Sequence, residues 1–394
     1  MPSVAAVLAV LLPPVTLTAL LIPRSAIFKT TSTSHAVLTK PVSRLSGRDV
    51  LTIITLILYK YILAALGLLP SLKPSDEADT QTFDLPALSL TSTLAINAED
   101  VLRFDAAAAP TRSSSPSSKD TQETPKSSRT LLVPGLVNPL MSILLANRTL
   151  PIQPFGCVNT RNTFTYLDAE ACRNPTQTLD LTRGITVSAS LGGLDNPGRR
   201  VKRGIEFDVL FEVAALRTGD TSPTTIFKQV GTVLAQLPRA TKPLFKESLQ
   251  PQAQTQPIGS ELEWTTADGE VVELRLDAPN KWASVCKDYN PIHMSSILAR
   301  LFGFPGKIAH GNHALARALE QLARNPSSVS PDIAERVERL MGSSDIQSAL
   351  EVQFRRPMVL PARMGLHVAT FKDGFAIRIV KNEKEHLVAQ WSTV

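Results

Sequence analysis

Alternating apolar and polar positions dominate the chain after about residue 130. A proline-bounded apolar run at 133–151 predicts a short helix. Period-two alternation rich in β-branched residues then predicts strands of an antiparallel sheet. These strands are expected at 162–168, 178–191, 202–216 and 225–237. The first unit predicted by this pattern is a helix followed by four strands.

The same kind of pattern recurs further along the chain. Entry strands are expected within 261–276, and apolar residues at helical spacing predict helices at 291–304 and 311–324. Closing strands are expected at 348–360, 362–371, 375–382 and 387–394. The sequence therefore predicts an α+β protein in which a helix-plus-sheet unit is used twice.

Two apolar runs lie near the N-terminus. The run that ends at Arg24 carries no charge before that residue and is long enough to span a bilayer. However, Pro13 and Pro14 interrupt this run, and no basic residue precedes it. A membrane anchor is the favoured interpretation, and a signal or organelle-targeting leader is the alternative. The second run, 51–70, has Lys60 at its centre, which makes a spanning helix costly and favours a helix packed on the globular body.

The segment 110–129 is polar and rich in Ser, Thr and Pro, which predicts a disordered insertion. Together these patterns divide the chain into four parts. They are a leader or anchor at 1–45, a helix and connector at 46–90, a first unit at 91–245 and a second unit at 255–394.

Composition narrows the function classes. The net charge of +6 is spread along the chain, and no nucleic-acid recognition motif is visible, so we expect no nucleic-acid partner. Three cysteines at uninformative spacings argue against a disulfide framework and against a zinc site of paired cysteines, and they favour a reducing compartment. A membrane-associated location is favoured, with the mitochondrion, the peroxisome and the cytoplasm as alternatives.

The candidate chemistry centres on "CKDYNPIH", residues 286–293. Asn290 is placed to cap a helix and Pro291 to occupy its first turn. Asp288 then lies in the entering loop and His293 near the helix start, where both side chains can reach one water as general acid/base groups. The competing interpretation is a capped turn whose acid and imidazole have no catalytic role.

A second element opens at Gly311, which starts an apolar helix whose first amide hydrogens have no acceptor within the helix. Such a start is suited to hold a developing oxyanion. His310 and His313 flank this glycine, but no neighbouring carboxylate or cysteine completes a ligand set, so no metal is expected.

Three stretches resemble the MaoC-like, or hydratase type 2, family in its two-unit (double) hot-dog form. They are "DYNPIH" at 288–293, "ARLFGFPGKIAHG" at 299–311 and "VQFRRPMVLPAR" at 352–363. The likeness covers roughly residues 90 to 394 and is strongest over 280–320. It implies antiparallel sheets, each wrapped around a central helix, with a degenerate first unit and a catalytic second unit.

The resemblance also implies an activity, the reversible addition of water to a trans-2-enoyl thioester, usually of coenzyme A, to give the (R)-3-hydroxyacyl thioester. Asp288 and His293 would activate and deliver the water, Asn290 would hold the loop, and the Gly311 amide would bind the thioester oxygen. No cofactor is required, because the substrate carries the coenzyme A. The residues expected to contact the substrate are Cys286, Lys287, His310, Asn312 and Arg355.

The chain departs from the family pattern at two places. Cys286 and Lys287 stand where Ser-Gly is usual, so Lys287 either changes the turn or puts a cation beside Asp288, and Asn312 makes the pocket wall more polar. Two alternatives therefore stay open, an acyl-CoA-binding or scaffold protein with weakened catalysis and a dehydratase for chains held on a carrier protein. A homodimer and membrane attachment through the N-terminus are further expectations.

Overall fold

The computed structural model describes residues 27–32, 34–75, 81–109, 128–154, 156–202, 204–236, 258–259, 261–344 and 346–394. The chain forms two compact units, each built from three separate segments. Unit 1 comprises residues 1–95, 136–163 and 180–257, and unit 2 comprises residues 96–135, 164–179 and 258–394.

Unit 1 is built on a sheet whose strands follow the order β1-β2-β4-β6-β8-β9-β5. β2 and β4 run parallel, whereas β6 pairs antiparallel with both β4 and β8. The strands are β1 (Phe28–Thr30), β2 (His35–Leu38), β3 (Thr82–Phe83), β4 (Leu88–Leu94), β5 (Cys157–Tyr166), β6 (Ile185–Leu191), β7 (Gly198–Val201), β8 (Gly204–Ala215) and β9 (Thr224–Gln236). The four strands predicted for this unit are confirmed as β5, β6, β8 and β9.

The helices of unit 1 include α2 (Gly47–Ala65) and α5 (Pro139–Leu145), which pack against each other, and the short turn η2 (Val42–Arg44). Ser46 and Asp49 form a capping box at the start of α2, where each side chain bonds the other residue's backbone N–H. The expected packed helix at 51–70 is therefore confirmed. Lys60 is buried in it and donates to the carbonyl of Leu145 at 2.8 Å.

Within the part of the chain that the structure describes, no helix combines the length and apolar character needed to cross a membrane. The apolar run 1–24 lies outside the described residues, as does most of the predicted disordered insertion. Residues 27–45, which the sequence pattern grouped with the leader, contain β1, β2 and η2 of unit 1.

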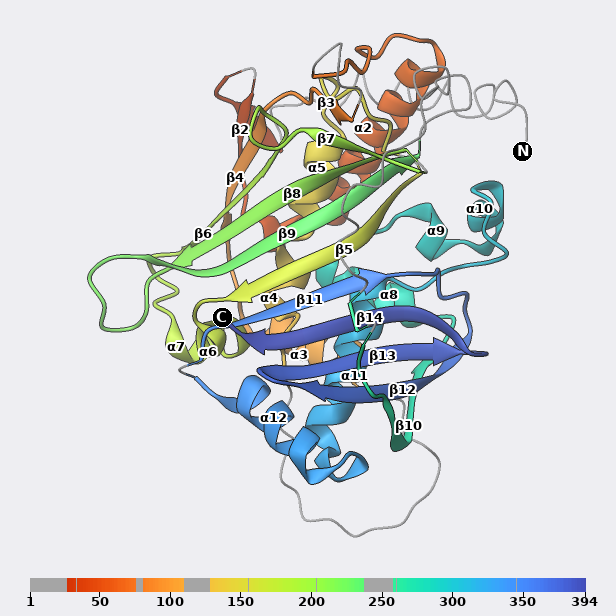
Figure 1. The fold of residues 1–394 in the computed structure, drawn as a ribbon. Helices are drawn as coiled ribbons and strands as arrows, with labels where there is room; N and C mark the ends of the chain where they lie inside the picture. The colour runs from red at the N-terminus through yellow and green to blue at the C-terminus, as the bar shows by residue number, and fades with distance from the viewer. Residues whose placement is uncertain are drawn as a thin grey trace. The chain divides into compact units, whose positions relative to one another are not determined.

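Unit 2 has a sheet of five antiparallel strands in the order β11-β14-β13-β12-β10 (Figure 1). The strands are β10 (Thr265–Leu274), β11 (Ser348–Phe354), β12 (Ala362–Phe371), β13 (Gly374–Lys381) and β14 (Lys384–Thr393). All of them overlap the predicted strand regions, although β13 begins before residue 375 and β14 begins before residue 387. Alternate residues of β12 are buried, as expected for a strand with one face on the core.

The central helix of unit 2 is α11 (Gly311–Arg324), as the sequence predicts. Every residue from His313 to Leu322 is buried, so the helix is covered on all sides rather than along one stripe. A sheet wrapped around such a helix is the hot-dog fold implied by the resemblance (Figure 1).

The other helices of unit 2 are α3 (Ala98–Ala108), α6 (Ala169–Arg173), α7 (Pro175–Thr178), α8 (Ala278–Cys286), α9 (Pro291–Met294), α10 (Ser296–Leu301), η4 (Pro326–Ser328) and α12 (Pro331–Gly342). Of these, α3, η4 and α12 pack on α11. α4 (Leu132–Val137) lies where the chain passes from one unit to the other. The sequence analysis did not predict α3, α8 or α12. It predicted one helix at 291–304, but Ser295 is extended and its side chain caps α10, which separates α9 from α10.

Two segments of the predicted first unit belong to unit 2. Residues 96–135 supply α3, which packs on α8 and α11, and residues 164–179 supply α6 and α7. Inside unit 2, the Ala107 carbonyl accepts hydrogen bonds from His313 Nε2 and Arg317 Nε, and the Ser128 hydroxyl donates to Glu320. These segments therefore complete the packing around α11.

Candidate active site

Asp288 lies in the short turn that leaves α8. Lys287 ends that helix in the left-handed conformation, with φ 52° and ψ 20°, and its N–H donates to the Ala283 carbonyl. The turn that a glycine favours is thus formed by a lysine. The Lys287 ammonium folds back onto its own helix, where it donates to the Ser284 carbonyl at 2.9 Å.

Asn290 is confirmed as the cap of α9. Its Oδ1 accepts from the Ile292 N–H at 3.3 Å, and Pro291 occupies the first helical position. The Asn290 N–H donates in turn to Asp288 Oδ1 at 3.1 Å, which fixes the carboxylate relative to the helix start. His293 follows within the same turn of helix.

His293 is held by a backbone carbonyl. Its Nδ1 lies 2.9 Å from the Ile308 oxygen, and because a carbonyl only accepts, Nδ1 carries the hydrogen. Nε2 of neutral His293 therefore bears the lone pair that a general base needs. Burial lowers the pKa of His293 from its ordinary value, although the charge of Asp288 opposes the shift. The imidazole is consequently neutral at neutral pH.

The structure brings His310 to the same place. Its Nε2 lies 3.1 Å from the Asp288 carbonyl and 3.7 Å from Asp288 Oδ2, and its ring is 3.8 Å from the His293 ring. One ligand-type atom from each of Asp288, His293 and His310 lies within 4.8 Å of the others. Asp288 and His293, which the sequence nominates as acid/base groups, therefore lie close together.

The same three residues have the composition of a metal site. The imidazole rings of His293 and His310 are tilted by 30° relative to each other.

Gly311 follows His310 and begins α11, so its amide opens next to the pair. A Cβ at this position would lie 2.4 Å from the ring of Phe354, which explains why only glycine fits. A free amide at the N-terminal end of a 14-residue helix is suited to hold negative charge on an oxygen.

The remaining predicted contact residues differ in their surroundings. Cys286 is buried in α8, and burial raises the pKa of its thiol well above the usual range, with the charge of Asp288 adding to the shift. Asn312 is partly exposed on the first turn of α11. His313 is fully buried and stacks on Trp282 at 5.2 Å, so the two histidines that flank Gly311 do not form a pair.

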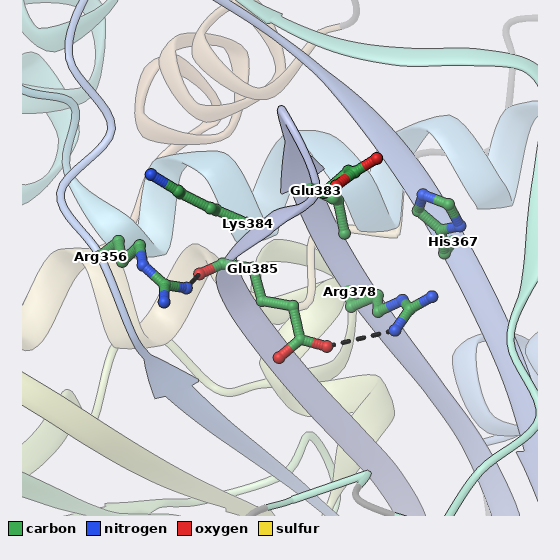
Figure 2. A pocket seen from close by; sticks show the side chains of 7 residues that line it. Arg356, His367, Arg378, Glu383, Lys384 and Glu385 are labelled. Carbon is green, nitrogen blue, oxygen red and sulfur yellow. Dashed lines mark hydrogen bonds and ion pairs between the residues drawn. The ribbon is translucent and has the colours of Figure 1, made fainter.

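Arg355 is engaged by other residues of unit 2. Its guanidinium pairs with Glu385 and donates to the Ile258 carbonyl at 3.0 Å. Glu385 also forms an ion pair with Arg378. Glu385 and Arg378 line a pocket of about 610 Å³, and Figure 2 shows their side chains there. The pocket is lined by Arg356, His367, Arg378, Val380, Glu383, Lys384 and Glu385, and Arg355 is not among the lining residues.

Unit 2 is thus a hot-dog domain with Asp288 and His293 close to the start of its central helix. Sequence comparison identifies the family that this region matches. Residues 254–337 match the family described as "MaoC like domain", so this part of the chain is a MaoC-like domain.

Two curated proteins are similar to part of this chain. The 3-hydroxyacyl-thioester dehydratase X of Mycobacterium tuberculosis is 35% identical over 112 residues, which are 28% of this chain and 33% of that protein. Fatty acid synthase subunit beta of Aspergillus oryzae is 31% identical over 115 residues, which are 28% of this chain and 6% of that protein. The alignments thus span a third or less of these relatives.

Among solved structures, that of HtdX from Mycobacterium tuberculosis aligns with 78% of this chain and with the whole of that chain. Its TM-score is 0.50 and its sequence identity is 20%, a likeness that concerns the fold.

Proposed function

We propose that unit 2 is a hydro-lyase that adds water reversibly across the double bond of a trans-2-enoyl thioester, giving the (R)-3-hydroxyacyl thioester. The observation that carries this proposal is the approach of Asp288 and His293 within 4.8 Å, directly beside the helix start at Gly311. The similarity of part of the chain to 3-hydroxyacyl-thioester dehydratase X supports the same reaction class.

The residues present can supply each step of a hydration. His293 Nε2 and the Asp288 carboxylate hold one water and remove its proton as the oxygen bonds to the β-carbon of the substrate. Negative charge then grows on the thioester oxygen, where the Gly311 amide stabilises it. The α-carbon finally takes a proton from the acid/base pair, so one water is added in total.

Coenzyme A is the proposed carrier of the acyl group. The proposed reaction is tested by comparing the hydration rate of the wild type with that of variants at Asp288 and His293. Purified full-length protein is incubated with crotonyl-CoA while the enoyl-thioester absorbance is followed. Asp288→Asn and His293→Ala should each lower kcat by about 10²- to 10⁴-fold, because each removes a general acid/base group.

Asp277→Asn is the matched control for this assay, because that carboxylate lies at the opposite end of α8 and pairs with Lys281. It should retain the wild-type rate. Wild-type rates in both site variants would contradict the assignment, as would acyl-CoA binding without turnover, which would instead indicate an acyl-CoA-binding protein.

A dehydratase for carrier-protein-bound chains is a second candidate, favoured by the similarity to a fatty acid synthase subunit. Matched rates on a coenzyme A ester and on the corresponding carrier-protein ester separate the two. A kcat/KM at least tenfold higher on the carrier-protein ester would favour the second candidate.

Membrane attachment and homodimer formation are also kept as proposals. Residues 1–24 have the apolar length of an anchor, so the tagged full chain should sediment with membranes and a chain lacking 1–24 should not. Equal fractionation of the two would argue against an anchor, and a monomeric mass by light scattering would exclude the homodimer.

A further inference from the structure

Residues 308–310, the segment directly before α11, contact both Asp288 and His293. Its Ile308 carbonyl accepts the Nδ1–H of His293 at 2.9 Å, and its His310 side chain reaches the Asp288 carbonyl at 3.1 Å. One element thus contacts the pair from both of its ends.

The segment is itself fixed by backbone hydrogen bonds. The Ile308 N–H donates to the Ile292 carbonyl at 3.2 Å, and the Ala309 N–H donates to the Met358 carbonyl at 2.9 Å. Ile308 also belongs to a buried apolar cluster with Ile292 and Ala299. Residues 308–310, held by these backbone hydrogen bonds, therefore contact both Asp288 and His293.

His310 is the only side chain of this segment that touches both acid/base residues. Only 6% of its surface is exposed, and its ring lies against that of His293, tilted by 30° with centroids 3.8 Å apart. Because a carbonyl only accepts, the contact with Asp288 puts the hydrogen on Nε2. Among the described residues Nδ1 has no hydrogen-bond partner, so its lone pair is left facing the interior.

This environment keeps His310 neutral. Burial lowers the pKa of His310 well below its ordinary value, and the neighbouring His293 lowers it further. A second cation next to a protonated His293 would cost free energy in such a site. Of the two neighbouring imidazoles, His293 is therefore the one that exchanges protons.

We propose that His310 is a positioning residue for the hydration reaction: its Nε2–H fixes the main chain of Asp288, and its neutral ring is the wall that holds His293 in place and keeps water from its face. This inference rests on the proposed function of the same site. It also replaces the expectation that His310 binds the substrate, because its donor is already used by Asp288.

The kinetic test compares His310→Ala with His310→Gln, whose side-chain amide can still donate to the Asp288 carbonyl. Since a misplacement of about 1 Å can cost 10²-fold, His310→Ala should lower kcat on crotonyl-CoA by roughly 10- to 100-fold and leave KM within about twofold. His310→Gln should recover most of the loss. His35→Ala in unit 1, which removes a histidine that bonds Ser89, is the control and should retain wild-type kinetics.

A rise in KM with unchanged kcat in His310→Ala would overturn the proposal in favour of a substrate-binding residue. Unchanged kcat and KM would overturn it in favour of a packing role.

A second measurement does not depend on turnover. Loss of the His310 ring lets water reach His293, so burial no longer lowers the pKa of His293 to the same extent and it should rise toward its ordinary value. Titration of the imidazole signals by NMR, assigned with His293→Ala, measures this in wild type, His310→Ala and His310→Gln.

An unchanged His293 pKa in folded His310→Ala overturns the inference, and if that variant does not fold, His310→Gln, which also lacks the ring, must show a raised His293 pKa. Wild type without turnover but with the expected pKa change would contradict the proposed function alone.

Discussion

At the scale of single residues, burial explains why similar side chains behave differently. His293, His310 and His313 lie within one region of unit 2, yet His293 keeps a lone pair beside a carboxylate, while burial lowers the pKa of His313 to about 3. Residue type and spacing were enough to nominate Asp288 and His293. They could not assign roles to the other two histidines, because these roles depend on the carbonyls and rings that each imidazole meets.

Lys60 in unit 1 gives a stability prediction. Burial lowers its pKa to about 7, and its ammonium has the Leu145 carbonyl as a hydrogen-bond acceptor. The folded-state pKa lies below that of the unfolded chain, so the cost of burying the charge is fully present below pH 7 and fades as the pH rises toward 10.

Lys60→Met should therefore raise the free energy of unfolding by a few kcal/mol at pH 6, where 1.36 kcal/mol per pKa unit sets an upper bound of about 5. The gain should shrink as the pH approaches 10, because the buried amine is then neutral and its charge no longer costs free energy. What remains at that pH is the loss of the hydrogen bond to Leu145. Urea unfolding of both proteins at pH 6, 8 and 10 measures the difference. A gain independent of pH would contradict the assigned cause.

At the scale of elements, the ends of helices determine the site. α8 must stop at Lys287 for Asp288 to turn inward, α9 must start at Asn290, and α11 must start at Gly311. The cap at Asn290 and the helix start at Gly311 could be predicted from the residue types and the apolar spacing that follows them. α8 could not, because its nine residues begin without a side-chain cap and owe their burial to packing against α3.

Lys287→Gly tests the turn after α8. A non-glycine residue at φ 52° costs the folded state about 1 kcal/mol. Glycine removes this cost, but it also gives the unfolded chain more conformational freedom, which cancels part of the gain in stability. We expect the variant to be more stable by up to about 1 kcal/mol and to keep its activity within about threefold. Thermal unfolding and the crotonyl-CoA assay give both values. A large loss of activity would show that the lysine has a role of its own in the site.

Gly311→Ala tests the start of α11. The new methyl group would lie 2.4 Å from Phe354 Cε1, so the helix start and the ring must move apart at a cost of about 1–3 kcal/mol, with a large loss of kcat. Phe354→Leu in the same chain should restore part of the lost stability. If the double variant is no more stable than Gly311→Ala, the clash with Phe354 is not the cause.

At the scale of the whole molecule, the units are not consecutive in sequence. Unit 2 takes residues 96–135 and 164–179 from the first half of the chain. Within it, the Phe104 ring lies 5.9 Å from the Trp282 ring, and the Tyr166 ring lies 6.1 Å from the Trp391 ring, measured between centroids. A domain boundary placed near residue 255 by pattern alone therefore cuts through a packed core.

The fragment 255–394 should consequently fail to fold as an independent domain. Without α3 it exposes Trp282 and leaves the buried His313 without its carbonyl partner at Ala107. We expect no cooperative thermal transition and poor dispersion of amide NMR signals, whereas the full chain unfolds cooperatively. Joining residues 96–135 to the fragment through a Gly/Ser linker should raise its stability, and a fragment that folds as well without them would contradict this account.

The sequence by itself determined the strands of the unit 2 sheet, four strands of unit 1, the helix α11 and the Asp288/His293 motif, because alternation, helix caps and a short motif are local properties. The tertiary structure alone decided how His310 and Ile308 hold that motif, why Gly311 has no side chain, and which distant segments complete unit 2. These features depend on contacts between residues far apart in the chain. No local pattern records such contacts, because their energy comes from burial and hydrogen bonding that exist only once the chain has folded.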